Sequence, residues 1–314
     1  MPLGAASRAA VVAVDRARTI TRRRRRRARS LAMATRAREA VPPSWLPFRA
    51  CDDGALVFHN SIVPGAFTRE MIGGADASTA MYASLCVPRA RARGLVVVVH
   101  TAIGAREAFV ERCCDALASA GFDAVAPDLY DAGACVFDKD TQRAIRGGIE
   151  RRAAFGARKV RETVRAFRRE TKTTQPWCAL GFCLGGQVVL DCARGLGADG
   201  DEDVLDDVRA VCSFHGVLDG VDLDGTAATS ARVLMCHGAS DPFVPPENVD
   251  ACLNDLRQRG IESMQLISFD GVKHGFTRPE KVQQSDFDAG FGYDAEATLA
   301  SWRACLDLLD DATT

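Results

Sequence analysis

The stretch from Pro176 to Arg194 restricts the possible folds more than any other part of this chain. Trp177 to Leu180 is an apolar run of strand length, and Leu184 to Arg194 has one apolar face at helical spacing. Between them, Gly181-Phe-Cys-Leu-Gly185 fits the pattern G-x-[S/C]-x-G, with glycine at both positions where a Cβ would clash. A strand, a tight turn and a helix in this order predict a nucleophile elbow that presents Cys183 above the sheet.

The position of Cys183 has chemical consequences. The free N–H groups and the positive dipole end of a helix N-terminus favour a thiolate over a thiol, and the thiolate is the nucleophilic form. The alternative is that Cys183 is a small buried apolar residue in a glycine-rich turn. The elbow interpretation makes a further prediction, because an acid and then a histidine should follow along the chain.

Strand and helix patterns alternate from Cys51 to the C-terminus. Gly94 to His100 is a continuous apolar, β-branched run, which is typical of a strand buried on both faces. We therefore predict an α/β fold with a mostly parallel central sheet and helices on both faces. The other expected strands are 55–59, 79–87, 122–127, 208–215, 232–237 and 264–269, and the other expected helices are 107–120, 141–172, 246–259 and 295–309.

The candidate acid is Asp241, in the loop after the strand that ends at His237. In a parallel sheet, ligands bind beyond the carboxyl ends of the strands, and this loop lies there. A triad carboxylate at this position would orient an imidazole and stabilise its cation. The alternatives are an Asx turn or a helix cap, and a metal site with His237, for which no third ligand has a sensible spacing. We therefore expect no metal and no cofactor.

Only one of the five histidines follows both the nucleophile and the acid. His274 lies after the last predicted strand, in a loop that could place its ring over the elbow. His59 lies in an early strand, before the elbow. His100, His215 and His237 lie at strand ends, where a histidine usually hydrogen-bonds the backbone and has no further role. The order Cys183, Asp241, His274 is that of nucleophile, acid and base.

Residues 1–44 differ from the rest and are predicted to be a disordered basic leader, followed by one domain at 45–314. They include the arginine run Arg22 to Arg27, and Asp15 and Glu39 are their only acids. An arginine-rich, acid-poor leader is typical of an organelle transit peptide, which predicts a plastid or mitochondrial location. A disordered tail or a nuclear-localisation patch has a similar composition. Translation from Met33 would instead give a cytoplasmic protein.

The overall composition excludes several classes of protein. The 314 residues carry a formal net charge of −1, which argues against nucleic acid as a partner. No apolar run approaches the ~18 residues that span a bilayer, so we expect no membrane partner. The 12 cysteines are scattered without a C-x-x-C pair, which predicts buried free thiols in a reducing compartment.

At this point the sequence resembles the dienelactone hydrolase family of α/β-hydrolases. The matching segments cover most of residues 50–310: Val96 to Gly104, Val125 to Tyr130, Gly181 to Gly186, His237 to Pro245, and His274 to Arg278. The resemblance implies the α/β-hydrolase fold, a triad of Cys183, Asp241 and His274, and an oxyanion hole formed by the backbone N–H groups of Leu184 and Ala102. It also implies that Arg278 binds a substrate carboxylate, with Arg143 or Arg146 as a second such residue.

Thr101 stands where the best-known members of that family have a glutamate that helps to ionise the cysteine, and we expect Thr101 to be among the substrate-binding residues. The substrate is therefore left open. A thiolate leaves a tetrahedral intermediate easily, so the chemistry favours an ester or enol lactone with a good leaving group. We expect a small anionic ester or lactone as substrate, and a monomer or a weak dimer. The rival interpretation is a non-catalytic small-molecule binder or a thiol redox protein.

Overall fold

This computed structural model describes residues 65–72, 81–88, 90, 92–105, 107–130, 154–197, 208–218 and 229–314. It also describes the backbone of three short strands, β1 (Ala9–Ala13), β2 (Arg49–Ala50) and β3 (Leu56–Val57). β2 and β3 form a separate antiparallel pair. Cys183, Asp241 and His274 come from the larger ranges.

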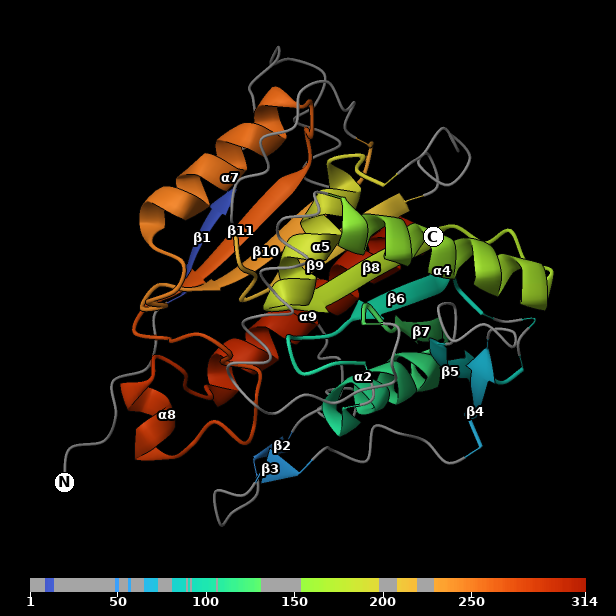
Figure 1. Cartoon of the computed structure of the whole chain (residues 1–314), viewed down its shortest axis with the longest axis horizontal. Helices are drawn as coiled ribbons and strands as arrows, with labels where there is room; N and C mark the ends of the chain where they lie inside the picture. The colour runs from blue at the N-terminus through green and yellow to red at the C-terminus, as the bar shows by residue number, and fades with distance from the viewer. Residues whose placement is uncertain are drawn as a thin grey trace, which may run out of the picture.

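A nine-stranded sheet forms the centre of the molecule, in the order β1-β11-β10-β9-β8-β6-β7-β5-β4 (Figure 1). Six neighbouring strands run parallel, namely β11, β10, β9, β8, β6 and β7. The strands on either side of them, β1 and β5, run antiparallel. The strands are β4 (Phe67–Ile72), β5 (Met81–Cys86), β6 (Leu95–Val99), β7 (Asp123–Pro127), β8 (Trp177–Phe182), β9 (Val208–Phe214), β10 (Arg232–Gly238) and β11 (Met264–Phe269).

Helices cover both faces of the sheet (Figure 1). One face packs against α4 (Phe155–Thr171), α5 (Leu184–Ala193) and α7 (Pro246–Gln258), and the other against α2 (Ala108–Ser119) and α9 (Ala295–Thr313). The side chains of β6 show why helices must pack on both faces of the sheet. Val97 and Val99 belong to the first core, Val96 and Val98 belong to the second, and all four are fully buried. This is the α/β architecture that the continuous apolar runs predict.

The predicted elements agree with the structure at most positions. The strand and helix around Cys183 extend over β8 and α5, with boundaries within two residues of the expected ones. Of the helix expected over 141–172, the structure shows α4, and the remainder lies outside the described residues. β4 and the short helix α8 (Gln284–Asp288) were not expected, because neither has a long apolar run. Within the described ranges, no helix is long and apolar enough to span a membrane.

The leader is not wholly separate from the fold. Its segment Ala9–Ala13 pairs antiparallel with β11 at the edge of the sheet, with Ala9 opposite Phe269. The sequence there is Ala-Ala-Val-Val-Ala, whose β-branched centre suits a strand. The rest of residues 1–44 lies outside the described part of the chain. The division into a leader at 1–44 and one domain at 45–314 stays a prediction.

Candidate active site

Cys183 lies on a strained turn between β8 and α5. Its backbone has φ 54° and ψ −113°, a conformation that costs a non-glycine residue about 1–3 kcal/mol. A Cβ on Gly181 would lie 2.1 Å from the carbonyl oxygen of Gly185, so the turn closes only with glycine at that position. The backbone of Cys183 is held from both sides, by its N–H to Phe214 O (3.1 Å) and by its C=O from Val217 N (3.1 Å). The predicted elbow geometry is confirmed.

Asp241 and His274 meet beyond the ends of β10 and β11. The Nδ1 atom of His274 lies 2.6 Å from Oδ2 of Asp241, and both side chains are buried. The other carboxylate oxygen of Asp241 accepts the N–H of Phe243 at 2.8 Å. Asp241 therefore makes the Asx-type turn and also holds the imidazole, so the two interpretations of this residue are compatible.

Cys183 lies against the same imidazole. Because Nδ1 faces Asp241, the ring nitrogen left for the hydrogen bond with Cys183 is Nε2. Burial alone would lower the pKa of His274. The charge of Cys183 and the hydrogen bonds that the ring donates to Asp241 and Cys183 outweigh burial and raise the pKa to about 10. Of the ten free cysteines in the described part of the chain, Cys183 is partly exposed and the others are buried. The structure thus brings thiol, imidazole and carboxylate together in that order.

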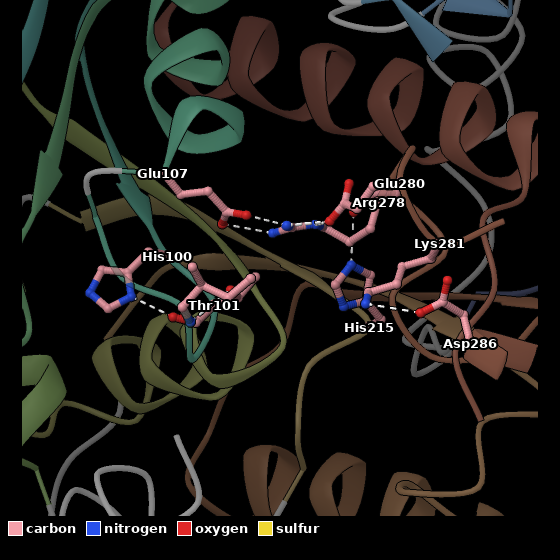
Figure 2. Close-up of polar contacts among 10 residues, drawn as sticks. His100, Thr101, Glu107, His215, Arg278, Glu280, Lys281 and Asp286 are labelled. Carbon is pink, nitrogen blue, oxygen red and sulfur yellow. Dashed lines mark hydrogen bonds and ion pairs between the residues drawn. The ribbon is translucent and has the colours of Figure 1, made fainter. Parts of the chain in front are cut away.

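His100 orients the peptide that joins Thr101 to Ala102. Its Nε2 accepts the N–H of Leu129 at 3.1 Å, so Nδ1 carries the proton and donates to Thr101 O at 2.5 Å (Figure 2). The C=O and N–H of a trans peptide point in opposite directions. Because the Thr101 carbonyl is held toward the His100 ring, the Ala102 N–H points away from that ring. Burial lowers the pKa of His100, which keeps this ring neutral.

Tyr130 fixes the other side of the same loop. Its hydroxyl donates to Ala102 O at 2.9 Å, and its ring packs edge-on against His100 at 4.9 Å. Burial, with the charge of Cys183 next, raises the pKa of Tyr130, so the hydroxyl stays protonated and remains a donor. Leu184 is the first residue of α5, and its N–H has no partner inside the helix. Leu184 thus directly follows the elbow residue, and the role of the Leu184 and Ala102 N–H groups as oxyanion donors stays a prediction.

Arg278 has different partners from those that the sequence predicts. Its guanidinium lies between two carboxylates of the protein, with NH1 2.8 Å from Glu107 Oε2 and Nε 2.6 Å from Glu280 Oε1, and with NH2 also on both (Figure 2). Its side chain is only 6% exposed. The protein's own acids thus hold the donors of Arg278, and its expected role in binding a substrate carboxylate stays a prediction. Arg143 and Arg146 lie outside the described residues.

Comparison with known proteins identifies the family of this chain. The profile of the Dienelactone hydrolase family matches residues 81–313. The chain belongs to the dienelactone hydrolase family. A carboxymethylenebutenolidase homolog of Mus musculus is 22% identical over 66% of this chain and 80% of its own. An uncharacterized protein of Caenorhabditis elegans is 38% identical over 43% of this chain and 78% of its own. A dienelactone hydrolase-like promiscuous phosphotriesterase from metagenomic libraries is 27% identical with a TM-score of 0.65, over 79% of this chain and 99% of that one.

Within this dienelactone hydrolase fold, Thr101 supports the loop that carries Ala102. Its hydroxyl accepts the N–H of Ile103 at 3.1 Å, and the residue is 7% exposed. A threonine is therefore tied into the loop at the position where the best-known members have a glutamate. Its expected role in substrate binding stays a prediction.

Two more histidines lie near His274, and the sequence did not reveal their surroundings. The ring of His215 packs edge-on against His274 at 5.1 Å, and its Nε2 lies 2.8 Å from Thr277 Oγ1 in the loop of His274. Burial, then His274 and Arg278, lowers the pKa of His215 well below its ordinary value. His237 is also buried, and burial lowers its pKa. Within the described ranges no cluster of three or more ligand-type side chains could hold a metal ion.

Proposed function

We propose that this chain hydrolyses activated carboxylic esters or enol lactones, with the Cys183 thiolate as nucleophile. The observation that carries the proposal is the contact between Asp241 and His274 at 2.6 Å, with the strained Cys183 on the other side of the ring. Membership of the dienelactone hydrolase family supports ester or lactone hydrolysis. Three groups in this order are the arrangement by which a base activates a nucleophile.

In the first step the thiolate adds to the ester carbonyl carbon. The carbonyl oxygen becomes an oxyanion, which the N–H groups of Leu184 and Ala102 stabilise, each worth roughly 3 kcal/mol in comparable sites. The C–O bond then breaks, and the leaving oxygen takes the proton from Nε2 of His274. The acyl group remains on Cys183 as a thioester.

In the second step water replaces the alcohol. His274 takes a proton from water as the oxygen adds to the thioester carbonyl, and the C–S bond breaks to release the acid and restore the thiolate. The first step limits the substrate, because the tetrahedral intermediate expels its better leaving group. A thiolate returns faster than an alkoxide leaves, so a phenolate or enolate leaving group is required.

The experiment is hydrolysis of phenyl acetate by the purified chain, combined with mass spectrometry of the intact protein. We expect an acetyl adduct on Cys183 and turnover that falls to background in Cys183→Ala. Cys86→Ala is the matched control, because Cys86 is a buried thiol in β5 and should retain turnover. Full activity of a folded Cys183→Ala protein would overturn the proposal.

The rival, a binder or a thiol redox protein, predicts a different result. Alkylation with iodoacetamide across pH separates an activated thiolate, which reacts well below pH 8, from the ordinary thiols of a binder. A redox thiol can also react at low pH, so the acyl adduct is the result that separates hydrolysis from thiol redox chemistry. One rapidly modified thiol at Cys183 supports hydrolysis. Slow modification of all cysteines with no acyl adduct would favour the binder.

A further inference from the structure

Phe243 is an exposed aromatic residue next to a buried base. It is 43% exposed, although most large apolar side chains in the described part of the chain are buried. Its ring meets His274 edge-on at 5.3 Å, and the partly exposed Phe291 meets the same imidazole at 5.5 Å. The two phenyl rings lie 5.1 Å apart. Together Phe243 and Phe291 form an aromatic wall beside His274.

The aromatic wall is held in place by the backbone of the site. The N–H of Phe243 is fixed by Asp241, and the backbone around Phe291 is bonded to His274 on both sides, through Gly290 O at 3.2 Å and Gly292 N at 3.1 Å. Gly290 has φ 88°, and a Cβ there would lie 2.4 Å from Pro242 Cγ. The wall therefore keeps its position relative to the imidazole.

In the proposed mechanism the leaving group comes next to the aromatic wall. The proposed oxyanion donors belong to the ends of β6 and β8, whereas His274 and Asp241 follow β11 and β10 across the sheet order. The acyl oxygen points to the first pair of strands. The leaving oxygen must reach Nε2 of His274, so the group attached to it lies against the rings that flank this imidazole.

The charges nearby do not attract an anion. Arg278 follows His274 by four residues, and its guanidinium is held by Glu107 and Glu280. A second cation near the wall is Lys281, whose Nζ lies 5.3 Å from the centre of the Phe291 ring. It is paired with Asp286 at 3.1 Å.

These two cations and three carboxylates together have a net charge of −1. A substrate carboxylate approaching the group would meet more negative charge than positive charge.

We infer that the site takes an uncharged aryl ester, whose phenolic leaving group stacks on Phe243 and Phe291. The inference rests on the proposed function and narrows it. Edge-on and offset aromatic contacts are available to a phenyl ring but not to an alkyl group of equal size. A phenolate is also a leaving group good enough for thiolate chemistry, so the binding surface and the mechanism favour the same substrate class.

The test compares two acetate esters on the full chain. One is phenyl acetate, and the other is a fluoroalkyl acetate whose alcohol matches phenol in acidity, so that only aromaticity differs. The measured quantity is kcat/KM for phenyl acetate divided by kcat/KM for the fluoroalkyl acetate. We expect Phe243→Ala to lower this ratio by about tenfold, which is the effect of losing one good aromatic contact. Phe243→Leu keeps apolar bulk and should lower it less. Met71→Ala removes an exposed apolar side chain of β4, 54% exposed, and should leave the ratio unchanged.

The charge of the substrate is tested with a second pair. The acetate ester of para-hydroxybenzoate carries a carboxylate, and that of its methyl ester does not. We expect a several-fold higher kcat/KM for the neutral ester. A preference for the carboxylate, or an unchanged aryl ratio in folded Phe243→Ala, overturns the inference while ester hydrolysis stands. Failure of the wild-type chain to hydrolyse any of the esters overturns the proposed function as well.

Discussion

Burial and the two neighbours of His274 shift its pKa in opposite directions. Burial disfavours the imidazolium, while Cys183 and Asp241 favour it, with the result that the pKa is raised from 6.5 to about 10. A raised pKa in the folded state stabilises that state fully below pH 6.5. This contribution is then lost as the pH rises through about 10.

The first prediction concerns this balance in Cys183→Ala. Removing the thiolate removes the largest influence that raises the pKa of His274, so the pKa should fall well below about 10 while the contact with Asp241 remains. NMR titration of the ring measures the pKa directly. The contribution of His274 to the free energy of unfolding, which is lost above pH 6.5, should become smaller as this pKa falls. A ring that still titrates near 10 in the variant would show that Cys183 is not its neighbour.

A second prediction concerns His100, which acts through another group and does not touch the substrate. In His100→Phe the Thr101 carbonyl loses its donor, and the Ala102 N–H is no longer held toward the oxyanion. We expect kcat to fall about 10²-fold with little change in KM, the size of effect for one lost oxyanion donor. Asn at this position still has an N–H₂ donor, so His100→Asn should recover part of the rate.

The control for His100 is the reactivity of Cys183 toward iodoacetamide. The thiolate depends on His274 and on α5, and neither of them bonds to the His100 ring. Alkylation of Cys183 should therefore keep its rate and pH profile in His100→Phe. Equal losses of alkylation and of kcat would indicate general damage to the fold and would contradict the positioning role.

At the scale of the elements, the junction of β8 with α5 shows steric requirements overriding helix propensity. Gly185 lies in the first turn of α5, where alanine is intrinsically better by up to about 1 kcal/mol. A Cβ there, however, would lie 2.3 Å from the backbone oxygen of Val99 in β6. Backbone cannot rotate away as a side chain can, so the helix must shift.

The third prediction follows from a comparison of two helical glycines. Gly185→Ala should destabilise the protein by more than about 3 kcal/mol and abolish hydrolysis, because it displaces the elbow. In α4, a Cβ on Gly156 would meet only the side chain of Val188, with Cγ2 at 2.5 Å and Cγ1 at 3.1 Å, and a side chain can shift where backbone cannot. Gly156→Ala should therefore cost less than Gly185→Ala. Urea unfolding measures both, and equal losses would contradict the argument.

The sequence predicts the elements better than it predicts side-chain partners. Continuous valines identified β6 and the glycine pattern identified the elbow, because both are local. Asp241 and His274 could be placed because chain order in this architecture puts them at one edge of the sheet. The pairing of Arg278 with Glu107 could not be predicted, since the residues are separated by 171 positions and meet only through packing. The positioning role of His100 could not be predicted either, because it depends on the orientation of the peptide between Thr101 and Ala102, and no sequence pattern indicates that orientation.

At the scale of the whole molecule, the leader raises a question about where the domain begins. Its composition predicts import into a plastid or mitochondrion, and a cleaved leader would take β1 with it. β1 is an edge strand that pairs only with β11, and β11 is also paired with β10 over six residues. The sheet that carries the functional residues is therefore complete without β1.

The last prediction is that deleting residues 1–44 preserves the site and weakens one edge of the sheet. The proposed catalytic residues follow β8, β10 and β11, whose mutual order does not involve β1, so kcat/KM for phenyl acetate should stay within about twofold of that of the full chain. Loss of one short edge strand should remove about 1 kcal/mol and lower Tm by about 2–4 °C. Steady-state kinetics and a thermal melt on both proteins measure this. A truncated chain that folds but loses tenfold in kcat/KM would mean that the leader belongs to the catalytic domain, because β1 then positions β11 and the His274 that follows it.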